Sequence, residues 1–274
     1  MSHNDAVMIA VAPNGARKTQ LDHPQLPISP KEIAHTAAAC REAGACMLHL
    51  HVRDENLRHS LDVEHYRNAI QTIRQEVGEE LIIQITTEAV GIYSTEEQIQ
   101  TVYEVRPEAV SLAIREISPT GADEKISAEF FKFLQREHIA PQYILYDNED
   151  ILHFGKLLER GIVPQENVSV LLVLGRYAEN QQSNPADLAP LLSILPEVPH
   201  WSLCAFGASE GECMIEAIQQ SGHCRVGFEN NLLMSDGNQA ADNAALVKAV
   251  GNSALLLDRT VATANDARRM LGMY

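Results

Sequence analysis

The feature that most constrains this chain is a regular alternation of short aliphatic runs with segments that carry helix signals. Runs of this length that are bounded by turn residues predict β-strands. We expect eight strands, over residues 6–11, 46–51, 81–86, 109–114, 143–146, 168–174, 200–205 and 224–228. The chain therefore reads as a repeated strand and helix unit.

The segments between these runs begin with recognisable helix caps. Ser29 is followed by a proline at the first helical position and by Glu32, which together predict a capped helix start. Ser94 and the glutamates that follow predict a second helix, and Asn184 with Pro185 predicts a third. Residues 262–274 read as a closing helix and a tail.

The strands are almost continuously apolar, as in residues 168–174. Such strands are typical of parallel sheets that helices cover on both faces. Eight units in 274 residues predict an α/β fold, a TIM (β/α)8 barrel in a single domain over residues 1–274. A doubly wound sheet is the alternative, because counting repeats does not reveal closure. No glycine-rich dinucleotide or P-loop motif is present.

The composition indicates which binding partners and which cellular location to expect. The net charge of −16 argues against a surface for nucleic acid or for an anionic membrane. No stretch approaches the length of a transmembrane helix, and the polar residues 1–5 do not resemble a signal peptide. A cytoplasmic location is therefore expected. The five cysteines contain no Cys-x-x-Cys pair and predict reduced, mostly buried thiols.

Two histidines end the second predicted strand. His49 and His51 are two residues apart, so their side chains share one face of a strand. Glu229 ends the eighth strand, and in a barrel strands two and eight flank strand one. Two histidines and a carboxylate with an open position are typical of a catalytic metal site. Zinc suits this set, although manganese, iron and cobalt also suit it.

Several segments resemble one known family, the β-keto acid cleavage enzymes. The matching residues are 12–16, 49–54, 84–87, 173–175 and 222–230, which follow the family order over nearly the whole chain. The resemblance implies a zinc-dependent TIM barrel that condenses a β-keto acid with acetyl-CoA as co-substrate. The products would be acetoacetate and the CoA ester of the remaining acyl group.

The resemblance also implies roles for individual residues. His49, His51 and Glu229 would bind the metal, which would polarise the ketone as a Lewis acid. Arg225 would stabilise charge during proton transfer, and Thr86 would donate a hydrogen bond to the keto acid. Substrate binding would also involve Asn14 in the first matching segment and Ser111 on the fourth strand.

This chain departs from the family pattern at three places. Asn230 stands where the member that cleaves an amino-substituted substrate has an aspartate base, and an amide cannot accept a proton. Another group or a water takes over that step, or Asn230 only orients Arg225. The two glutamates that hold the substrate ammonium in that member have no evident counterpart, and Arg17 occupies the first of those regions. We therefore expect a neutral or anionic substrate tail with Arg17 as its partner, unless Arg17 is only a solvated loop residue.

The remaining expectations concern CoA, assembly and secondary contacts. Gly175 and Arg176 follow the sixth strand, where barrels often bind phosphate, so they are candidates for CoA binding. Arg53 and Asp54 are expected to form an ion pair, and His59 is expected at a surface or helix position. The family resemblance implies a homotetramer.

Two alternatives to this reaction stay open at this point. One is a zinc-dependent aldolase or hydrolase that needs no CoA, against which the lack of a clear second carboxylate base argues. The other is a non-catalytic metal-binding barrel, which Asn230 suggests. The acyl tail that is accepted, the group that replaces the missing base and the metal are not determined by the sequence.

Overall fold

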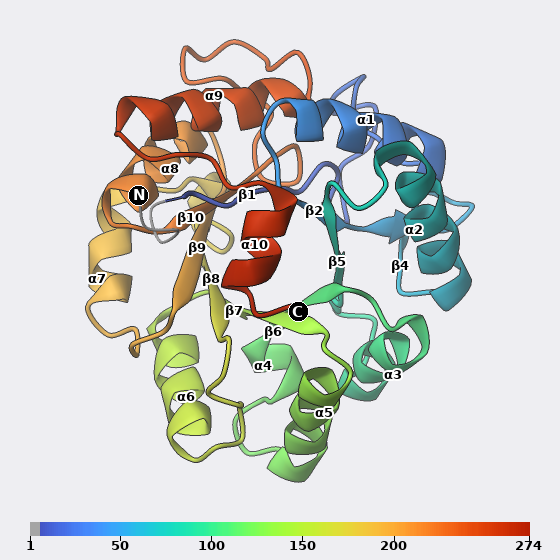
Figure 1. Cartoon of the computed structure of the whole chain (residues 1–274), viewed down its shortest axis with the longest axis vertical. Coiled ribbons are helices and arrows are strands. Elements are labelled where there is room, and N and C mark those ends of the chain that lie inside the picture. The colour runs from blue at the N-terminus through green and yellow to red at the C-terminus, as the bar shows by residue number, and fades with distance from the viewer. Residues whose placement is uncertain (1–5) are drawn as a thin grey trace.

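The computed structural model describes residues 6–274, so the polar start at residues 1–5 lies outside the described residues. Eight parallel strands form a closed barrel in the order β1-β10-β9-β8-β7-β6-β5-β2 (Figure 1). The barrel strands are β1 (Ile9–Val11), β2 (Met47–Leu50), β5 (Ile82–Thr86), β6 (Ala109–Ala113), β7 (Ala140–Leu145), β8 (Ser169–Leu174), β9 (His200–Ala205) and β10 (His223–Val226). Closure confirms the predicted TIM barrel over the doubly wound alternative.

The helices surround the barrel and follow the expected alternation. They are α1 (Pro30–Glu42), α2 (Val63–Val77), α3 (Thr95–Val105), α4 (Ile114–Ile117), α5 (Glu124–Arg136), α6 (Asn148–Glu159), α7 (Leu188–Leu192), α8 (Glu210–Gln219), α9 (Asn243–Leu256) and α10 (Ala264–Met270). Ser29 and Ser94 both form capping boxes, as predicted. The start predicted at Asn184 is a single 3₁₀ turn, Pro185–Asp187, that leads into α7. No helix within residues 6–274 is long and apolar enough to cross a membrane.

The strand boundaries differ from the prediction by two or more residues at three strand ends. β1 begins at Ile9, and residue 7 forms only an isolated bridge to Val261. β7 begins three residues before the predicted start, because the polar and proline-containing segment at its beginning still pairs with β6. β10 ends at Val226, since Gly227 has a φ of +136° that interrupts extended backbone.

A small hairpin follows β2 and consists of β3 (Val52–Arg53) and β4 (His59–Ser60). It lies directly after the two histidines, on the same side of the barrel as α2 (Figure 1). All five cysteines are buried and free, as expected.

The amino-terminal end of the barrel is closed by α10, which crosses the barrel centre in Figure 1. Ala264, Ala267 and Leu271 pack there against residues of the first strands, including Met8 and Met47. At the opposite end of the barrel, the carboxyl ends of the strands continue into loops. This is the end of a TIM barrel that carries active sites.

Candidate active site

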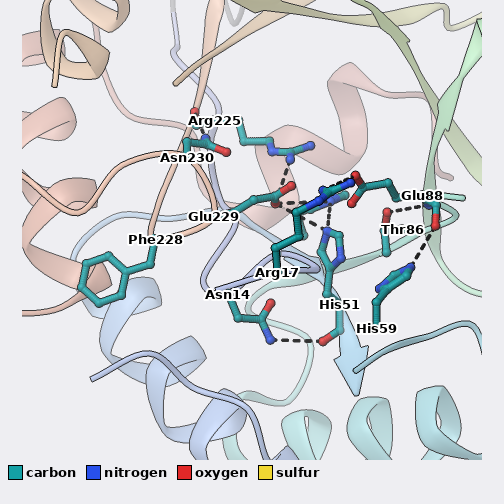
Figure 2. A network of polar contacts seen from close by, with 12 residues as sticks. Asn14, Arg17, His51, His59, Thr86, Glu88, Arg225, Phe228, Glu229 and Asn230 are labelled. Carbon is teal, nitrogen blue, oxygen red and sulfur yellow. Dashed lines mark hydrogen bonds and ion pairs between the residues drawn. The ribbon is translucent and has the colours of Figure 1, made fainter. Parts of the chain in front are cut away.

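Three side chains from distant parts of the sequence converge at the carboxyl end of the barrel. His49 lies on β2, His51 follows that strand and Glu229 follows β10. The Nε2 atoms of the two histidines are 3.1 Å apart. Oε2 of Glu229 lies 3.8 Å from Nε2 of His49 and 3.5 Å from Nε2 of His51 (Figure 2). One divalent cation can contact three atoms at such spacing.

The His49 ring is held in the form that a metal requires. Its Nδ1 lies 2.8 Å from Oε1 of Gln84, an atom that only accepts hydrogen bonds, so Nδ1 carries the hydrogen. The Nε2 lone pair is then directed toward His51 and Glu229. Burial lowers the pKa of His49 well below its usual value, and Arg225 adds to this effect. A neutral imidazole with a free Nε2 is the metal-binding species, so the residues present fit a divalent metal.

Gln84 is itself oriented by a chain of polar side chains inside the barrel. Its Nε2 donates to Oε1 of Gln142 at 3.3 Å. Nε2 of Gln142 lies 3.5 Å from Oγ of Ser169 and 3.3 Å from Oγ of Ser202. No role for Gln84 was predicted, although an amide within an otherwise aliphatic strand, Ile82–Thr86, is a signal for one.

Electrostatics and a close backbone contact hold the Glu229 carboxylate. Nη2 of Arg225 forms an ion pair with Oε2 of Glu229 at 2.9 Å. Although burial opposes ionisation, Arg225 and then His51 hold the pKa of Glu229 well below its usual range. A Cβ on Gly15 would lie 2.5 Å from Cγ of Glu229, so only glycine fits beside this ligand.

Arg225 and Thr86 offer unused donors to the same pocket. Nε and Nη1 of Arg225 are buried and have no hydrogen-bond partner among residues 6–274. Oγ1 of Thr86 accepts a hydrogen bond from the Glu88 backbone N–H at 3.0 Å, which leaves the hydroxyl hydrogen available. Buried donors without partners are costly, and a ligand oxygen would satisfy them.

Two other predicted residues, Asn14 and Ser111, lie beside His51 and Thr86. Asn14 is fully buried, and its Nδ2 donates to the backbone oxygen of His51 at 3.3 Å. Its visible contact is thus with the chain beside the metal ligand. Ser111 pairs in register with Thr86 on the neighbouring strand, and its buried hydroxyl has no partner among the described residues. It does not line the pocket that contains Arg225 and Glu229.

Asn230 contacts the turn that follows β10. Its Nδ2 lies 3.4 Å from the backbone oxygen of Arg225 and 3.5 Å from Oε1 of Glu210. Glu210 also receives hydrogen bonds from Nδ2 of Asn231 at 3.2 Å and from the Gly227 backbone N–H at 3.3 Å. Burial raises the pKa of Glu210 to about 8. Asn230 therefore binds the backbone of Arg225 and a buried carboxyl group, and has no hydrogen bond to the guanidinium.

The predicted arginines Arg17 and Arg176 both form ion pairs with Glu88, a carboxylate for which no role was predicted. Nη1 of Arg17 and Nη2 of Arg176 lie 2.9 Å and 3.1 Å from the same oxygen of Glu88 (Figure 2 shows Arg17 and Glu88). Burial opposes ionisation of Glu88, but His51 and the Arg17 hydrogen bond hold its pKa below the usual value. Its place two residues beyond the end of β5 was the signal that could have found it.

The pocket beside His49 and Glu229 has two kinds of wall. Its lining residues are His49, Thr86, Glu88, Ile144, Tyr146, Val173, Arg176, Cys204, Phe206, Arg225 and Glu229. The side toward β2 and β10 carries the ligand set and Arg225. The side toward β7 and β8 is aliphatic and aromatic, and it ends at Arg176 and Glu88.

Several expectations about neighbouring residues were wrong. Arg53 and Asp54 do not pair: Arg53 donates to the backbone oxygens of Gly15, Lys18 and Leu57, while Asp54 pairs with Arg58. The guanidinium therefore stabilises the loop after β1.

His59 is likewise neither at the surface nor on a helix. It is buried on β4, with its ring 5.4 Å from that of His51 and its Nε2 2.8 Å from the backbone oxygen of Glu88. Two carboxyl groups, Glu88 and Glu210, also lie near the site where the sequence analysis expected no clear second carboxylate.

Gly175 has a structural reason to be glycine. It turns the chain after β8 with a φ of +79°, and a Cβ at this position would lie 2.8 Å from the backbone nitrogen of Ser183. Its surroundings are backbone atoms of the same loop, and they neither require nor exclude the predicted CoA contact.

The fold and the site together define a TIM barrel with a candidate metal centre at the carboxyl ends of its strands. A family model described as beta-keto acid cleavage enzyme matches residues 6–273. The chain therefore belongs to the β-keto acid cleavage enzyme family, as the sequence resemblance predicted.

Individual relatives agree with this assignment. A protein from Fusobacterium nucleatum named 3-keto-5-aminohexanoate cleavage enzyme is 29% identical over 274 residues, which cover 98% of each chain. A protein from Cupriavidus necator named 3-oxoadipate:acetyl-CoA acetyltransferase is 25% identical, over 97% of this chain and 94% of that protein.

Among solved structures, apo ObcA superposes with a TM-score of 0.70 at 18% identity. The match covers 91% of this chain and 66% of the ObcA chain. At this identity the similarity supports the barrel fold alone.

Proposed function

We propose that this protein is a metal-dependent transferase that condenses a β-keto acid with acetyl-CoA and releases acetoacetate and a new acyl-CoA. The family assignment and the printed name of the Cupriavidus necator relative support the reaction and the co-substrate. The observation that carries the metal dependence is the convergence of His49, His51 and Glu229 on one point. We propose zinc as the metal because this is a mixed imidazole and carboxylate set with room for further ligands.

The residues around this point suit the chemistry of β-keto acid cleavage. A bound divalent cation would act as a Lewis acid toward the keto and carboxylate oxygens of the substrate. The unpartnered Nε–H and Nη1–H of Arg225 can donate to an oxygen on which negative charge develops. The Thr86 hydroxyl can donate to a second substrate oxygen.

Asn230 takes a positioning role in this proposal. An amide does not accept a proton at neutral pH, and its Nδ2 is directed to the Arg225 backbone oxygen and to Glu210. Asn230 thus holds the end of β10, which carries Arg225, and the turn after it, which carries Glu229. Asn14 acts similarly on the other side, through the backbone oxygen of His51.

The substrate tail is proposed to be neutral or anionic and not ammonium-bearing. Two guanidinium groups, those of Arg17 and Arg176, share the single carboxylate of Glu88 at the mouth of the pocket. A cationic tail that approached Glu88 would also approach both arginines, and the like charges would repel it.

A product assay tests the proposal. The protein is incubated with zinc, acetyl-CoA and a panel of β-keto acids, and acetoacetate and new acyl-CoA are measured by mass spectrometry. Product that requires both acetyl-CoA and metal supports the transferase. Product without acetyl-CoA indicates an aldolase or hydrolase, and metal binding without any product indicates a non-catalytic barrel.

Variants connect the assay to the site. His49→Ala should lose both the bound metal and turnover, whereas His35→Ala, on the exposed face of α1, should retain both. Arg225→Lys keeps one positive charge but loses the planar set of donors, so kcat should fall by about 100-fold to 1000-fold while metal is retained. Unchanged turnover in Arg225→Lys would contradict the proposed role.

A further inference from the structure

Glu88, Arg17 and Arg176 form a charged trio at the mouth of the pocket. The loops after β5, β1 and β8 supply one residue each, so the trio bridges three separate parts of the barrel rim. Side chains of Arg176 and Glu88 are 14% and 18% exposed, while that of Arg17 is 55% exposed. Two members are therefore largely withdrawn from water.

The two guanidinium groups and one carboxylate of the trio carry a net charge of +1. Among the other charged residues that line the pocket, Arg225 and Glu229 pair one to one at 2.9 Å. Glu116 also interacts with Glu88, but its carboxylate accepts a hydrogen bond from the Ala89 backbone N–H.

Arg176 has unused hydrogen-bonding capacity. A guanidinium carries five N–H donors, and Arg176 uses only Nη2 toward Glu88, with no other side-chain hydrogen bond to the described residues. Its guanidinium carbon lies 5.2 Å from the centre of the Phe206 ring, which also lines the pocket. The free donors are thus held at the pocket by an aromatic ring on one side and by Glu88 on the other.

The wall that leads to Arg176 is apolar. Ile144 is the fifth residue of β7. Val173 is the fifth residue of β8 and lies three residues before Arg176 in the sequence. Both line the pocket opposite the strands that carry the metal ligands. A ligand that extends from His49 and Glu229 across the barrel would therefore meet methyl groups on one side of the pocket and Arg176 with Glu88 on another.

We propose that Glu88 and Arg176, with Arg17, form the specificity site for the substrate tail, and that this site selects a tail ending in a carboxylate. This inference rests on the proposed transferase function and narrows it. Methylene groups of the tail would contact Ile144 and Val173, and the terminal carboxylate would bind the free N–H groups of Arg176 beside Glu88. Glu88 keeps the two arginines close together without cancelling their charge.

Three substrates of equal chain length test the selection. They are 3-oxoadipate with a carboxylate end, 3-oxohexanoate with a methyl end and 3-oxo-5-aminohexanoate with an ammonium group. We expect kcat/KM for 3-oxoadipate to exceed that for each of the others by at least about tenfold. Equal or better turnover of 3-oxohexanoate or of the amino acid would overturn the inference.

Variants separate charge recognition from folding. Arg176→Met should lower kcat/KM for 3-oxoadipate by about tenfold to 100-fold and change that for 3-oxohexanoate by less than about threefold. Arg160→Met, an arginine paired with Glu124 outside the pocket, is the matched control and should change neither value. Metal content is measured in each variant. An equal loss for both substrates in Arg176→Met would overturn the inference.

Glu88→Gln tests the glutamate itself. The amide keeps an acceptor oxygen for the arginines but removes the negative charge, so the ratio of 3-oxoadipate to 3-oxohexanoate turnover should rise. A fall in this ratio would contradict the charge balance described above. Failure of the tail inference is distinguishable from failure of the proposed function, because in the second case none of the three substrates gives acetoacetate.

Discussion

The amide nitrogen of Asn230 lies 3.5 Å from a carboxyl oxygen of Glu210, and both side chains are buried. The amide of Asn230 directly follows Glu229 in the sequence, and the carboxyl group of Glu210 contacts the turn that contains both residues. Because Glu210 also binds the Asn231 side chain and the Gly227 backbone, the turn that carries Glu229 depends on it.

Asn230→Asp should destabilise the protein. The substitution puts two carboxyl groups next to each other in a buried site, where both cannot be charged without a large cost. We expect a loss of about 1–3 kcal/mol in the free energy of unfolding at pH 8. Adding Glu210→Gln restores one acid and one amide and should recover most of the loss. Urea unfolding of the single and double variants measures this coupling, and additive losses would contradict it.

The pH dependence of stability should report Glu210. Its pKa is about 8 in the folded protein, against a usual value of 4.5. Between pH 4.5 and about 8, the folded state therefore keeps a proton on Glu210 that the unfolded state has lost. The stability contributed by this group is fully present below pH 4.5, and it falls as the pH rises to about 8. The slope attributable to Glu210 should approach about 1.4 kcal/mol per pH unit.

Two variants isolate this slope. Glu210→Gln should remove it, because the amide does not titrate. Glu212→Gln changes an exposed residue on the same helix and should leave the slope as in the unchanged protein. Urea unfolding at several pH values between 5 and 8 gives the comparison. A slope that survives in Glu210→Gln would assign it to another group.

Gln84→Leu should weaken metal binding without removing a ligand. The substitution deletes the acceptor that holds hydrogen on Nδ1 of His49, so the free Nε2 tautomer is no longer favoured. We expect metal affinity to fall by about tenfold to 100-fold, measured by competition with a chromophoric chelator. Gln142→Leu removes only the next amide in the chain and should cost less. An equal or larger effect of Gln142→Leu would exclude a direct role of Gln84.

Gly15→Ala should disturb the metal glutamate. Gly15 has a φ of +62°, and the added Cβ would lie 2.5 Å from Cγ of Glu229. Gly161→Ala is the matched control, because its φ of +68° is close to that of Gly15 while no atom lies within 4 Å of the added Cβ. Both variants should lose about 1 kcal/mol of stability from the backbone strain. Only Gly15→Ala should also lose metal affinity, and equal affinities in the two variants would contradict this account.

The repeat of strands and helices could be predicted because it is a local property. The aliphatic run at β8 and the caps at Ser29 and Ser94 act through neighbouring residues, and the structure confirms them. Strand ends were less accurate where backbone conformation changes at one residue, as at Gly227. The ligand set could be inferred because the order of strands in a barrel places β2 and β10 on either side of β1.

The charged and amide partners of the site could not be inferred in this way. Glu88 pairs with arginines that are 71 and 88 residues away, and Glu210 meets Asn230 across 20 residues. Such contacts depend on how the loops after different strands turn over the barrel mouth, and no local pattern encodes those turns. The expected pair of Arg53 and Asp54 failed for the same reason, since adjacency in sequence does not fix the direction of two side chains.

The sequence by itself determined the barrel and the convergence of His49, His51 and Glu229 at one end of it, since hydrophobic periodicity and strand order specify both. Only the tertiary structure decided which groups surround them. It placed Gln84 behind His49, Glu210 beside Asn230, and Glu88 between Arg17 and Arg176. The physical reason is that hydrogen bonds and ion pairs act over a few ångströms, so they follow distances in space and not separations along the chain.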